Sequence, residues 1–191
     1  MTHSDLSTYA RPTGCLYLLI AVSGFFSILW VPSQLVVPTD PVATAQNIQQ
    51  NRSLVAWGVL GDTVMMTAEV LVSVMLFMMF RAQGTVLALA AMVSRLMMAA
   101  VMAAMLLVHA AVLGLSDPGT GLTSFSLVQR AELAQLFREA HASGVWVWQV
   151  FFALHLVLLG LLVARSQAFP RGMGVGLALG GLGYLVDSVR A

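Results

Sequence analysis

The sequence is constrained most by two long apolar runs that contain charged residues. Residues 53–80 are almost wholly apolar, yet they include Asp62 and Glu69. After a short polar turn, residues 85–114 form a second apolar run, which includes Arg95. Runs of this length are typical of helices that cross a lipid bilayer. The pair therefore predicts a transmembrane helical hairpin with charges inside it.

The positions of these charges predict that two of them face each other. If both runs are helical, counting back from the turn at an equal rise per residue puts Arg95 at the depth of Glu69. A charge at the centre of a bilayer costs roughly 2.5–3.5 kcal/mol, so opposite charges at one depth are expected to pair inside a helix bundle. We therefore expect Glu69 and Arg95 to be in contact.

The composition excludes a water-soluble domain. The chain has 191 residues, of which 59% are hydrophobic and 9% are charged, whereas soluble domains carry about a quarter charged residues. The net charge of +1 gives no indication of a nucleic-acid partner. Cys15 is the single cysteine, which excludes an intrachain disulfide and a cysteine-based metal site. The sequence predicts a polytopic protein that resides in the lipid bilayer.

The apolar segments predict an all-α integral membrane protein, a bundle of five transmembrane helices. Residues 1–13 are expected to form a polar N-terminal tail, and residues 14–191 a single transmembrane helical domain. The five predicted helices cover residues 14–31, 53–80, 85–114, 141–163 and 172–189.

Two short amphipathic helices are expected at the membrane interface. The first, residues 41–50, has Asp40 as a candidate N-cap. The second, residues 127–139, begins after Ser126, which is placed to form a capping box with Gln129. Its mixture of apolar and polar residues predicts that it lies on the membrane surface or runs straight into the fourth transmembrane helix.

Four intramembrane residues form a candidate buried polar cluster. His155 lies about ten residues from the end of its predicted helix, as Glu69 and Arg95 do in theirs, so the three share a level near the midplane. Asp62 precedes Glu69 by seven residues and lies on the same helix face.

Two interpretations of this cluster stay open. In a functional pocket, Glu69 or Asp62 would exchange protons, while Arg95 would hold an anion or fix a carboxylate. His155 would then donate or relay a proton. The alternative is a structural ion pair that fixes the helix register, with His155 as a hydrogen-bond partner.

His109 and His141 are predicted near the opposite membrane interface. Two histidines on adjacent helix ends can ligate a metal or haem iron, but no HExxH or other short metal spacing is present. Interfacial hydrogen bonding is the favoured interpretation, and no metal or other cofactor is predicted. The twelve methionines are scattered around their helices, which indicates flexible apolar filling rather than a copper site.

The last predicted helix is rich in glycine. Gly172, Gly176 and Gly180 recur at four-residue spacing, and small residues at this spacing allow helices to approach closely in lipid. The pattern predicts a helix-packing face that a second copy of the chain could use. The alternative is a glycine-rich helix without a partner.

Several short segments follow one another in a characteristic order. They are Gly14-Cys-Leu-Tyr-Leu-Leu-Ile, Val36-Val-Pro-Thr-Asp, Ala43-Thr-Ala, Ser94-Arg-Leu, His141-Ala-Ser-Gly, Phe151-Phe-Ala-Leu-His155-Leu-Val-Leu-Leu-Gly160, Pro170-Arg-Gly-Met-Gly and Gly183-Tyr-Leu-Val-Asp187-Ser188. In their order and spacing they resemble the bacterial membrane proteins grouped as domain of unknown function 4386. The resemblance runs from about Arg11 to the C-terminus.

This resemblance implies a fold more than an activity, because the family has no assigned activity. Family members usually continue into a further membrane helix after the segment that ends at Ser188, whereas this chain stops at Ala191. Two interpretations stay open, a short family member or a chain without its last helix, and a pocket that such a helix closes would then be open here. The positions that match the family's polar pattern are Arg95, His141, His155, Tyr184, Asp187 and Ser188.

Three functions stay open at the level of sequence. The first is binding of a small lipophilic ligand by an accessory or sensing component. The second is an intramembrane enzyme that acts on a lipid or isoprenoid by acid–base chemistry, and the third is a structural subunit of a membrane complex. A transporter is less expected because no inverted repeat is evident. The resemblance implies a bacterial inner-membrane protein, and the balance of charged residues favours a cytoplasmic N-terminus.

Overall fold

A computed structural model describes residues 3–117, 119 and 121–190, and all regular structure in these residues is helical. Five of the described helical segments are long and apolar enough to cross a membrane. They are Thr8–Leu35, Arg52–Gln83, Thr85–Leu115, Leu127–Arg165 and Arg171–Val189. The predicted all-α fold with five transmembrane helices is confirmed.

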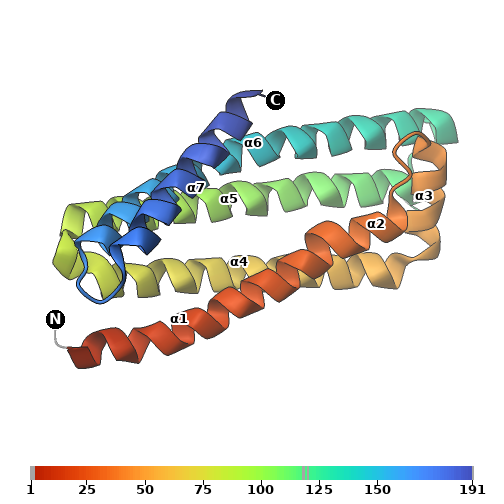
Figure 1. The fold of residues 1–191 in the computed structure, drawn as a ribbon. Coiled ribbons are helices and arrows are strands. Elements are labelled where there is room, and N and C mark those ends of the chain that lie inside the picture. The colour runs from red at the N-terminus through yellow and green to blue at the C-terminus, as the bar shows by residue number, and fades with distance from the viewer. Residues whose placement is uncertain (1–2, 118, 120, 191) are drawn as a thin grey trace.

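The described elements follow one another as shown in Figure 1. In chain order they are α1 (His3–Gly24), the π-helix η1 (Phe25–Trp30), α2 (Val31–Leu35), α3 (Pro41–Gln50), α4 (Arg52–Phe80), the 3-10 turn η2 (Arg81–Gln83), α5 (Thr85–Ser116), α6 (Leu127–Arg165) and α7 (Arg171–Arg190).

The first helix is longer than the sequence suggested. It begins at His3 rather than near residue 14, so most of the expected polar tail consists of its first turns. Pro12 lies inside the helix, where its ring removes one backbone donor. Thr13 Oγ1 donates to Tyr9 O at 2.7 Å, a side-chain hydrogen bond that links the two turns around the proline.

Both predicted helix caps are present. Asp40 Oδ1 accepts a hydrogen bond from Ala43 N at 2.9 Å, which caps α3. Ser126 and Gln129 form the reciprocal capping box at the start of α6. The amphipathic segment 127–139 is the beginning of α6 and continues without interruption into the membrane span, because no glycine or proline stands at the junction to end the helix.

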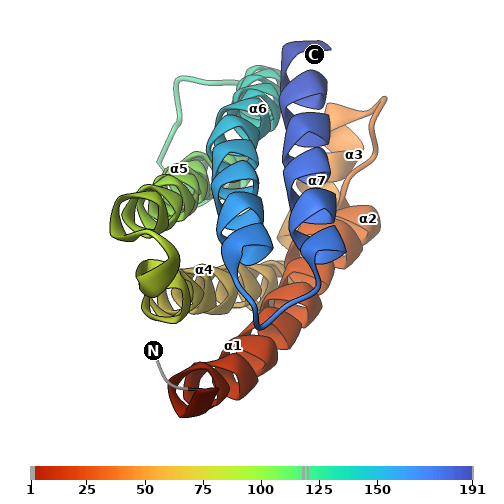
Figure 2. The same ribbon diagram turned by 60° about the vertical axis from the view of Figure 1, so that its left-hand side comes forward.

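The long helices pack against one another in chain order: α1 against α4, α4 against α5, α5 against α6 and α6 against α7. Figure 2 shows this succession, with α1 and α7 as its two outer members. The main core lies where α4, α5 and α6 meet and includes Val72, Ala91 and Leu162. A groove lies between α1 and α7, with residues of α4 and α6 in its wall.

The close contact between α6 and α7 depends on glycines other than the predicted three. A Cβ atom added at Gly174 would lie 2.5 Å from Gly160 O, and one added at Gly181 would lie 2.7 Å from Ala153 O. No side chain larger than hydrogen fits there. The predicted face, Gly172, Gly176 and Gly180, has nothing within 4 Å of the added Cβ atoms among the described residues and is exposed on the opposite side of α7.

Candidate functional site

The centre of the bundle holds an ion pair between neighbouring helices. Arg95 Nε on α5 lies 2.6 Å from Glu69 Oε2 on α4. Arg95 is 2% exposed and Glu69 is 6% exposed, so both charges are removed from solvent and from lipid. Burial of either charge alone in the membrane interior would be costly, and the attraction between the two opposite charges offsets that cost.

His155 on α6 completes the contact between three helices. Its Nε2 lies 3.0 Å from Arg95 Nη1, and its Nδ1 lies 2.8 Å from Ala91 O. An arginine can only donate, so Nε2 accepts from Arg95. The Nδ1 atom therefore carries the ring proton and donates it to the Ala91 carbonyl. This arrangement holds the imidazole neutral, in a single tautomer and orientation.

Two aromatic residues that the sequence analysis did not identify cover this cluster. Tyr17 OH on α1 accepts a hydrogen bond from Arg95 Nη1 at 3.0 Å. The Arg95 guanidinium carbon also lies 5.0 Å from the centre of the Tyr17 ring and 5.9 Å from that of Phe152, within the range of cation–π attraction. The Phe152 ring in turn stacks on the His155 ring, with the two ring centres 6.2 Å apart. The sequence analysis placed the start of the first span at residue 14, which put Tyr17 near its end, whereas the span in the structure runs from Thr8 to Leu35 and puts Tyr17 deeper.

We define the polar cluster as Tyr17, Glu69, Arg95 and His155. It joins α1, α4, α5 and α6 at one level of the bundle. The hydroxyl hydrogen of Tyr17 finds no acceptor among the described residues. The cluster therefore retains one hydrogen-bond donor for another molecule.

A cavity of about 290 Å³, which Tyr17 helps to line, lies in the groove between α1 and α7. We call it the α1–α7 cavity. Its wall is apolar apart from Thr13 and Tyr17. The residues that line it are Ala10, Thr13, Gly14, Tyr17, Leu76, Met79, Phe80, Leu159, Val163, Phe169, Met173 and Leu177. An apolar cavity with one or two polar groups is the usual form of a small-molecule site.

A comparison of the sequence with known families gives a match over most of the chain. Residues 13–191 match the family described as Domain of unknown function (DUF4386). The chain belongs to the DUF4386 family. No curated protein and no solved structure matches it. The polar residues of this DUF4386 protein therefore have to be interpreted from their own geometry.

Asp62 of the DUF4386 chain does not join the polar cluster. Two helical turns separate it from Glu69, about 10 Å along the α4 axis. It lines two other cavities, one with His109 and the other with His141. The sequence pattern placed Asp62 and Glu69 on one face of α4, and the structure distributes them between different sites along that face.

His109, near the end of α5, and His141, in the first half of α6, lie close together. Their ring centres are 6.1 Å apart, and His141 Nδ1 lies 3.3 Å from Met105 O. Among the described residues, no group of three or more histidine, cysteine, aspartate or glutamate side chains is arranged to hold a metal ion. The contacts of this pair are an interhelical hydrogen bond and an edge-on ring contact.

Tyr184 and Asp187 lie on α7, where it crosses α6. Asp187 Oδ2 accepts a hydrogen bond from Gln149 Nε2 at 2.9 Å. The Tyr184 ring meets Phe152 edge-on at 5.1 Å. Tyr184 is thus linked through Phe152 to the polar cluster, whereas Asp187 fastens α7 to α6 at another level.

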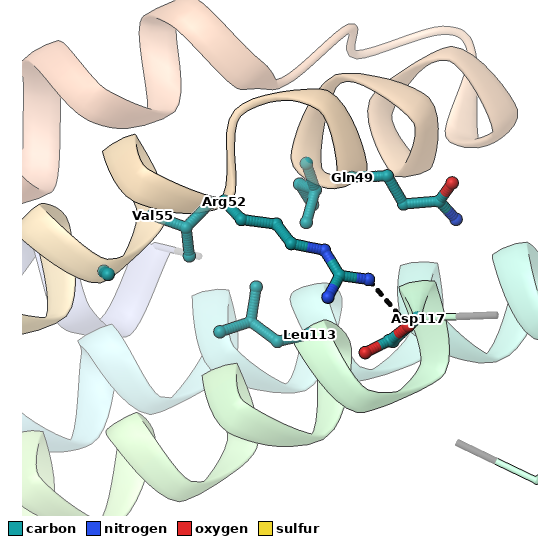
Figure 3. Close-up of a pocket in the computed structure, with 7 residues that line it drawn as sticks. Gln49, Arg52, Val55, Leu113 and Asp117 are labelled. Atoms are coloured by element: carbon teal, nitrogen blue, oxygen red, sulfur yellow. Dashed lines mark hydrogen bonds and ion pairs between the residues drawn. The ribbon is translucent and has the colours of Figure 1, made fainter. Parts of the chain in front are cut away.

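A further cavity of about 220 Å³ opens at the end of the bundle where α4 begins and α5 ends. In Figure 3, Arg52 reaches across it to Asp117, beside Gln49, Val55 and Leu113. Arg52 Nη2 lies 2.6 Å from Asp117 Oδ1, with the side chains 61% and 35% exposed. The Gly119 backbone N–H and the Arg52 guanidinium lower the pKa of Asp117 below its usual range. An exposed pair of this kind contributes little to stability.

Proposed function

We propose that this DUF4386 protein binds a small lipophilic molecule in the α1–α7 cavity, as an accessory or sensing component of the membrane. The observation that carries the proposal is the position of Tyr17. Tyr17 lines the cavity, and its hydroxyl oxygen accepts a hydrogen bond from Arg95 while the hydroxyl hydrogen has no acceptor among the described residues.

The chemistry of the wall favours a particular class of ligand. An apolar body would fill the space beside Leu76, Leu159 and Leu177, which releases apolar surface from contact with other lipids. A hydrogen-bond acceptor on that body, such as a ketone, ester or carboxylate oxygen, would take the Tyr17 hydrogen. Arg95 polarises the hydroxyl by donating to its oxygen, which strengthens this bond.

The position of the cavity supports a sensing role. The ligand would contact α1 and α7, two helices that pack mainly against α4 and α6 respectively. Binding would therefore couple the two outer helices of the bundle. A ligand with differential affinity for two arrangements of these helices shifts their populations.

Native mass spectrometry of the protein, extracted gently from its own membrane, tests the proposal. Gly14 lines the cavity, and a Cβ added there meets nothing within 4 Å among the described residues. Gly14→Leu is therefore expected to fill the cavity without disturbing helix packing and to abolish a defined ligand mass seen on the wild type. Gly183→Leu, on open surface of α7, is the matched control and is expected to retain it.

The polar contact is tested separately. Tyr17→Phe removes the hydroxyl and is expected to lower ligand occupancy, whereas Tyr9→Phe removes a hydroxyl outside the cavity and is expected to leave occupancy unchanged. A wild-type protein without any bound small molecule, or a ligand mass that survives Gly14→Leu, would contradict the proposal.

An enzyme that uses acid–base chemistry at Glu69, Asp62 and His155 finds less support. Glu69 and His155 are 6% and 1% exposed, and both are engaged with Arg95. Asp62 lies in a different cavity. A proton-exchanging pair would need a direct approach to the reacting atoms of the substrate.

A structural role has one specific observation in its favour. Gly172, Gly176 and Gly180 are exposed on α7 with open space above them, and such a face permits close helix association in lipid. We propose a second copy of the chain as its partner. Gly176→Leu is expected to convert a cross-linked dimer in native membranes to monomer, whereas Leu182→Phe, on another face of α7, is not.

We also propose the bacterial inner membrane as the location, with the N-terminus in the cytoplasm. Five spans put the two termini on opposite sides of the membrane. Arg11, Arg81, Arg165 and Arg171 lie on the N-terminal side, with fewer acidic residues than the other side carries. Alkaline phosphatase fused after the C-terminus is expected to be active, and the same enzyme fused after Gln83 inactive. The reverse pattern would contradict this orientation.

A further inference from the structure

The cavity that Asp62 lines together with His141 lies in the opposite half of the bundle from the α1–α7 cavity. Its volume is about 140 Å³, and residues of η1, α4, α5 and α6 enclose it. We call it the Asp62 cavity. Its polar residues are Asp62 and His141, and its wall includes Met65, Met102 and Trp148. None of these residues belongs to the polar cluster or lines the α1–α7 cavity.

The Asp62 carboxylate makes no ion pair within 4.0 Å in the described part of the chain, although its charge acts on the His109 ring. The ion pairs found there within 4.0 Å join Arg52 to Asp117 and Arg95 to Glu69. His109 and Arg138 line the adjoining cavity of about 60 Å³, which Asp62 also lines, but no nitrogen of either comes within that distance of the carboxylate. Asp62 also makes no hydrogen bond through its side chain to the described residues.

The depth of Asp62 makes this lack of a partner significant. Asp62 precedes the end of α4 at Phe80 by eighteen residues, about 27 Å at the helical rise per residue. Trp148 precedes the end of α6 at Arg165 by seventeen residues, which gives nearly the same depth. A hydrocarbon core of about 30 Å puts both side chains just inside its boundary with the headgroups, the level at which tryptophan is enriched.

The lining of the cavity selects a soft organic cation rather than a metal ion. Among the described residues, no group of three or more histidine, cysteine, aspartate or glutamate side chains is arranged to hold a metal ion. The cavity instead combines one carboxylate with a tryptophan ring and the thioethers of Met65, Met66, Met102 and Met105. Aromatic faces and thioethers suit a weakly hydrated ammonium group, and the carboxylate supplies the opposite charge.

We propose that the Asp62 cavity binds the ammonium group of a lipophilic amine. Asp62 pairs with the charge, Trp148 covers it, and the alkyl part leaves over Ile28, which lines the cavity and is 50% exposed. Ile28 belongs to the π-helix η1, and π-helical turns inside transmembrane helices are frequent at functional sites. The amine can be carried by a membrane lipid headgroup or by a free amphiphile, and both place the same group at this depth.

Native mass spectrometry of the full-length protein tests the charge requirement, with dodecyltrimethylammonium as the probe and dodecanol as its neutral counterpart. Wild-type protein is expected to bind the ammonium probe at least tenfold more tightly than dodecanol. Asp62→Asn, which keeps the size of the side chain, is expected to lose that preference. Glu132→Gln removes an exposed negative charge elsewhere and is expected to keep it. Equal binding of the probe to wild type and Asp62→Asn would overturn the proposal.

A second measurement uses only wild-type protein and does not depend on the folding of a variant. Dicyclohexylcarbodiimide reacts with carboxyl groups inside membranes, and peptide mapping reports its attachment at Asp62. The ammonium probe is expected to reduce labelling of Asp62 several-fold, and dodecanol is expected to leave it unchanged. Labelling that the ammonium probe does not reduce would overturn the proposal.

Mixed nanodiscs distinguish the two sources of the amine. Co-purification of phosphatidylethanolamine in preference to phosphatidylglycerol, lost in Asp62→Asn, identifies a lipid headgroup as the ligand. Binding of dodecyltrimethylammonium without that lipid preference identifies a free amphiphilic amine. Either outcome supports the ammonium site. Wild-type protein that shows neither the lipid preference nor binding of dodecyltrimethylammonium would overturn it.

Discussion

Arg95 on α5 and Glu69 on α4 meet through Nε and Oε2 at 2.6 Å, and neither side chain is more than 8% exposed. The pair fixes how α4 and α5 are rotated toward each other, because any other rotation would leave two opposite charges apart in an apolar medium. Tyr17 and His155 bind the same guanidinium, so one arginine side chain sets the relative positions of four helices.

Reversal of this ion pair tests the contact directly. Glu69→Arg and Arg95→Glu are each expected to lower the free energy of unfolding by about 3–5 kcal/mol, because each leaves two like charges buried. The double variant restores opposite charges and is expected to be more stable than either single variant. It will not regain wild-type stability, because Tyr17 and His155 lose their donor. Thermal unfolding in detergent measures all three, and a double variant no more stable than the singles would contradict the contact.

Two replacements of His155 distinguish the contribution of its hydrogen bonds to stability from the contribution of its side-chain volume. His155→Leu leaves the Ala91 carbonyl and one Arg95 N–H without this partner and is expected to cost about 1–3 kcal/mol. His155→Asn can both donate and accept, so it is expected to cost less. His141→Leu is the control, because the hydrogen bond of His141 is longer, at 3.3 Å, and only partly buried. Similar losses for His155→Leu and His141→Leu would argue against the special role of His155.

The two glycine faces of α7 are expected to respond in opposite ways to alanine. A Cβ at Gly174 would lie 2.5 Å from Gly160 O and 2.7 Å from Ala164 N, so α6 and α7 would have to separate. We expect Gly174→Ala to lower stability by about 1–3 kcal/mol. Gly176→Ala meets open space and is expected to raise stability by up to about 1 kcal/mol through helix propensity. Unfolding midpoints of the two variants check this, and equal values would contradict the packing.

Acid is expected to weaken the contact at the end of the bundle. The folded state lowers the pKa of Asp117 through the Gly119 backbone N–H and Arg52. A carboxyl group with a lowered pKa stabilises the fold above its ordinary pKa of about 3.9, and this contribution is lost as the pH falls through the lower, folded value. The stability difference between wild type and Asp117→Asn should therefore be largest near neutral pH and shrink below about pH 4. Glu132→Gln controls for the loss of one exposed charge, and a difference that grows with acid would contradict the prediction.

Most of the fold could be predicted because it follows from local properties of the chain. Hydropathy identified five spans, and the short-range chemistry of Asp40 and Ser126 located two helix starts. The start of α1 was placed too late, because the polar residues and Pro12 before Gly14 suggested a tail, whereas the helix begins at His3 and continues through Pro12. The depth count also brought Glu69, Arg95 and His155 to one level, where the structure has them in contact.

The site itself could be predicted only in part. The depth of a residue in the membrane follows from counting residues along its helix. The direction in which its side chain points depends instead on the tilt of that helix and on which helices lie next to it. For this reason Tyr17 and Phe152 were not recognised as the cover of Arg95, and Asp62 was grouped with Glu69 although it lines another cavity. The same reason explains why Gly174 and Gly181, rather than Gly176, make the close contact with α6.

The sequence by itself determined that this chain is a bundle of five membrane-spanning helices of the DUF4386 family, with opposite charges that must pair near the midplane. Only the tertiary structure decided which residues surround those charges, and that a cavity reaches Tyr17 between α1 and α7. Hydrophobicity drives helices into the bilayer without regard to their neighbours. Packing between helices then sets their rotation through close contacts at a few small and polar residues, and hydropathy carries no record of that rotation.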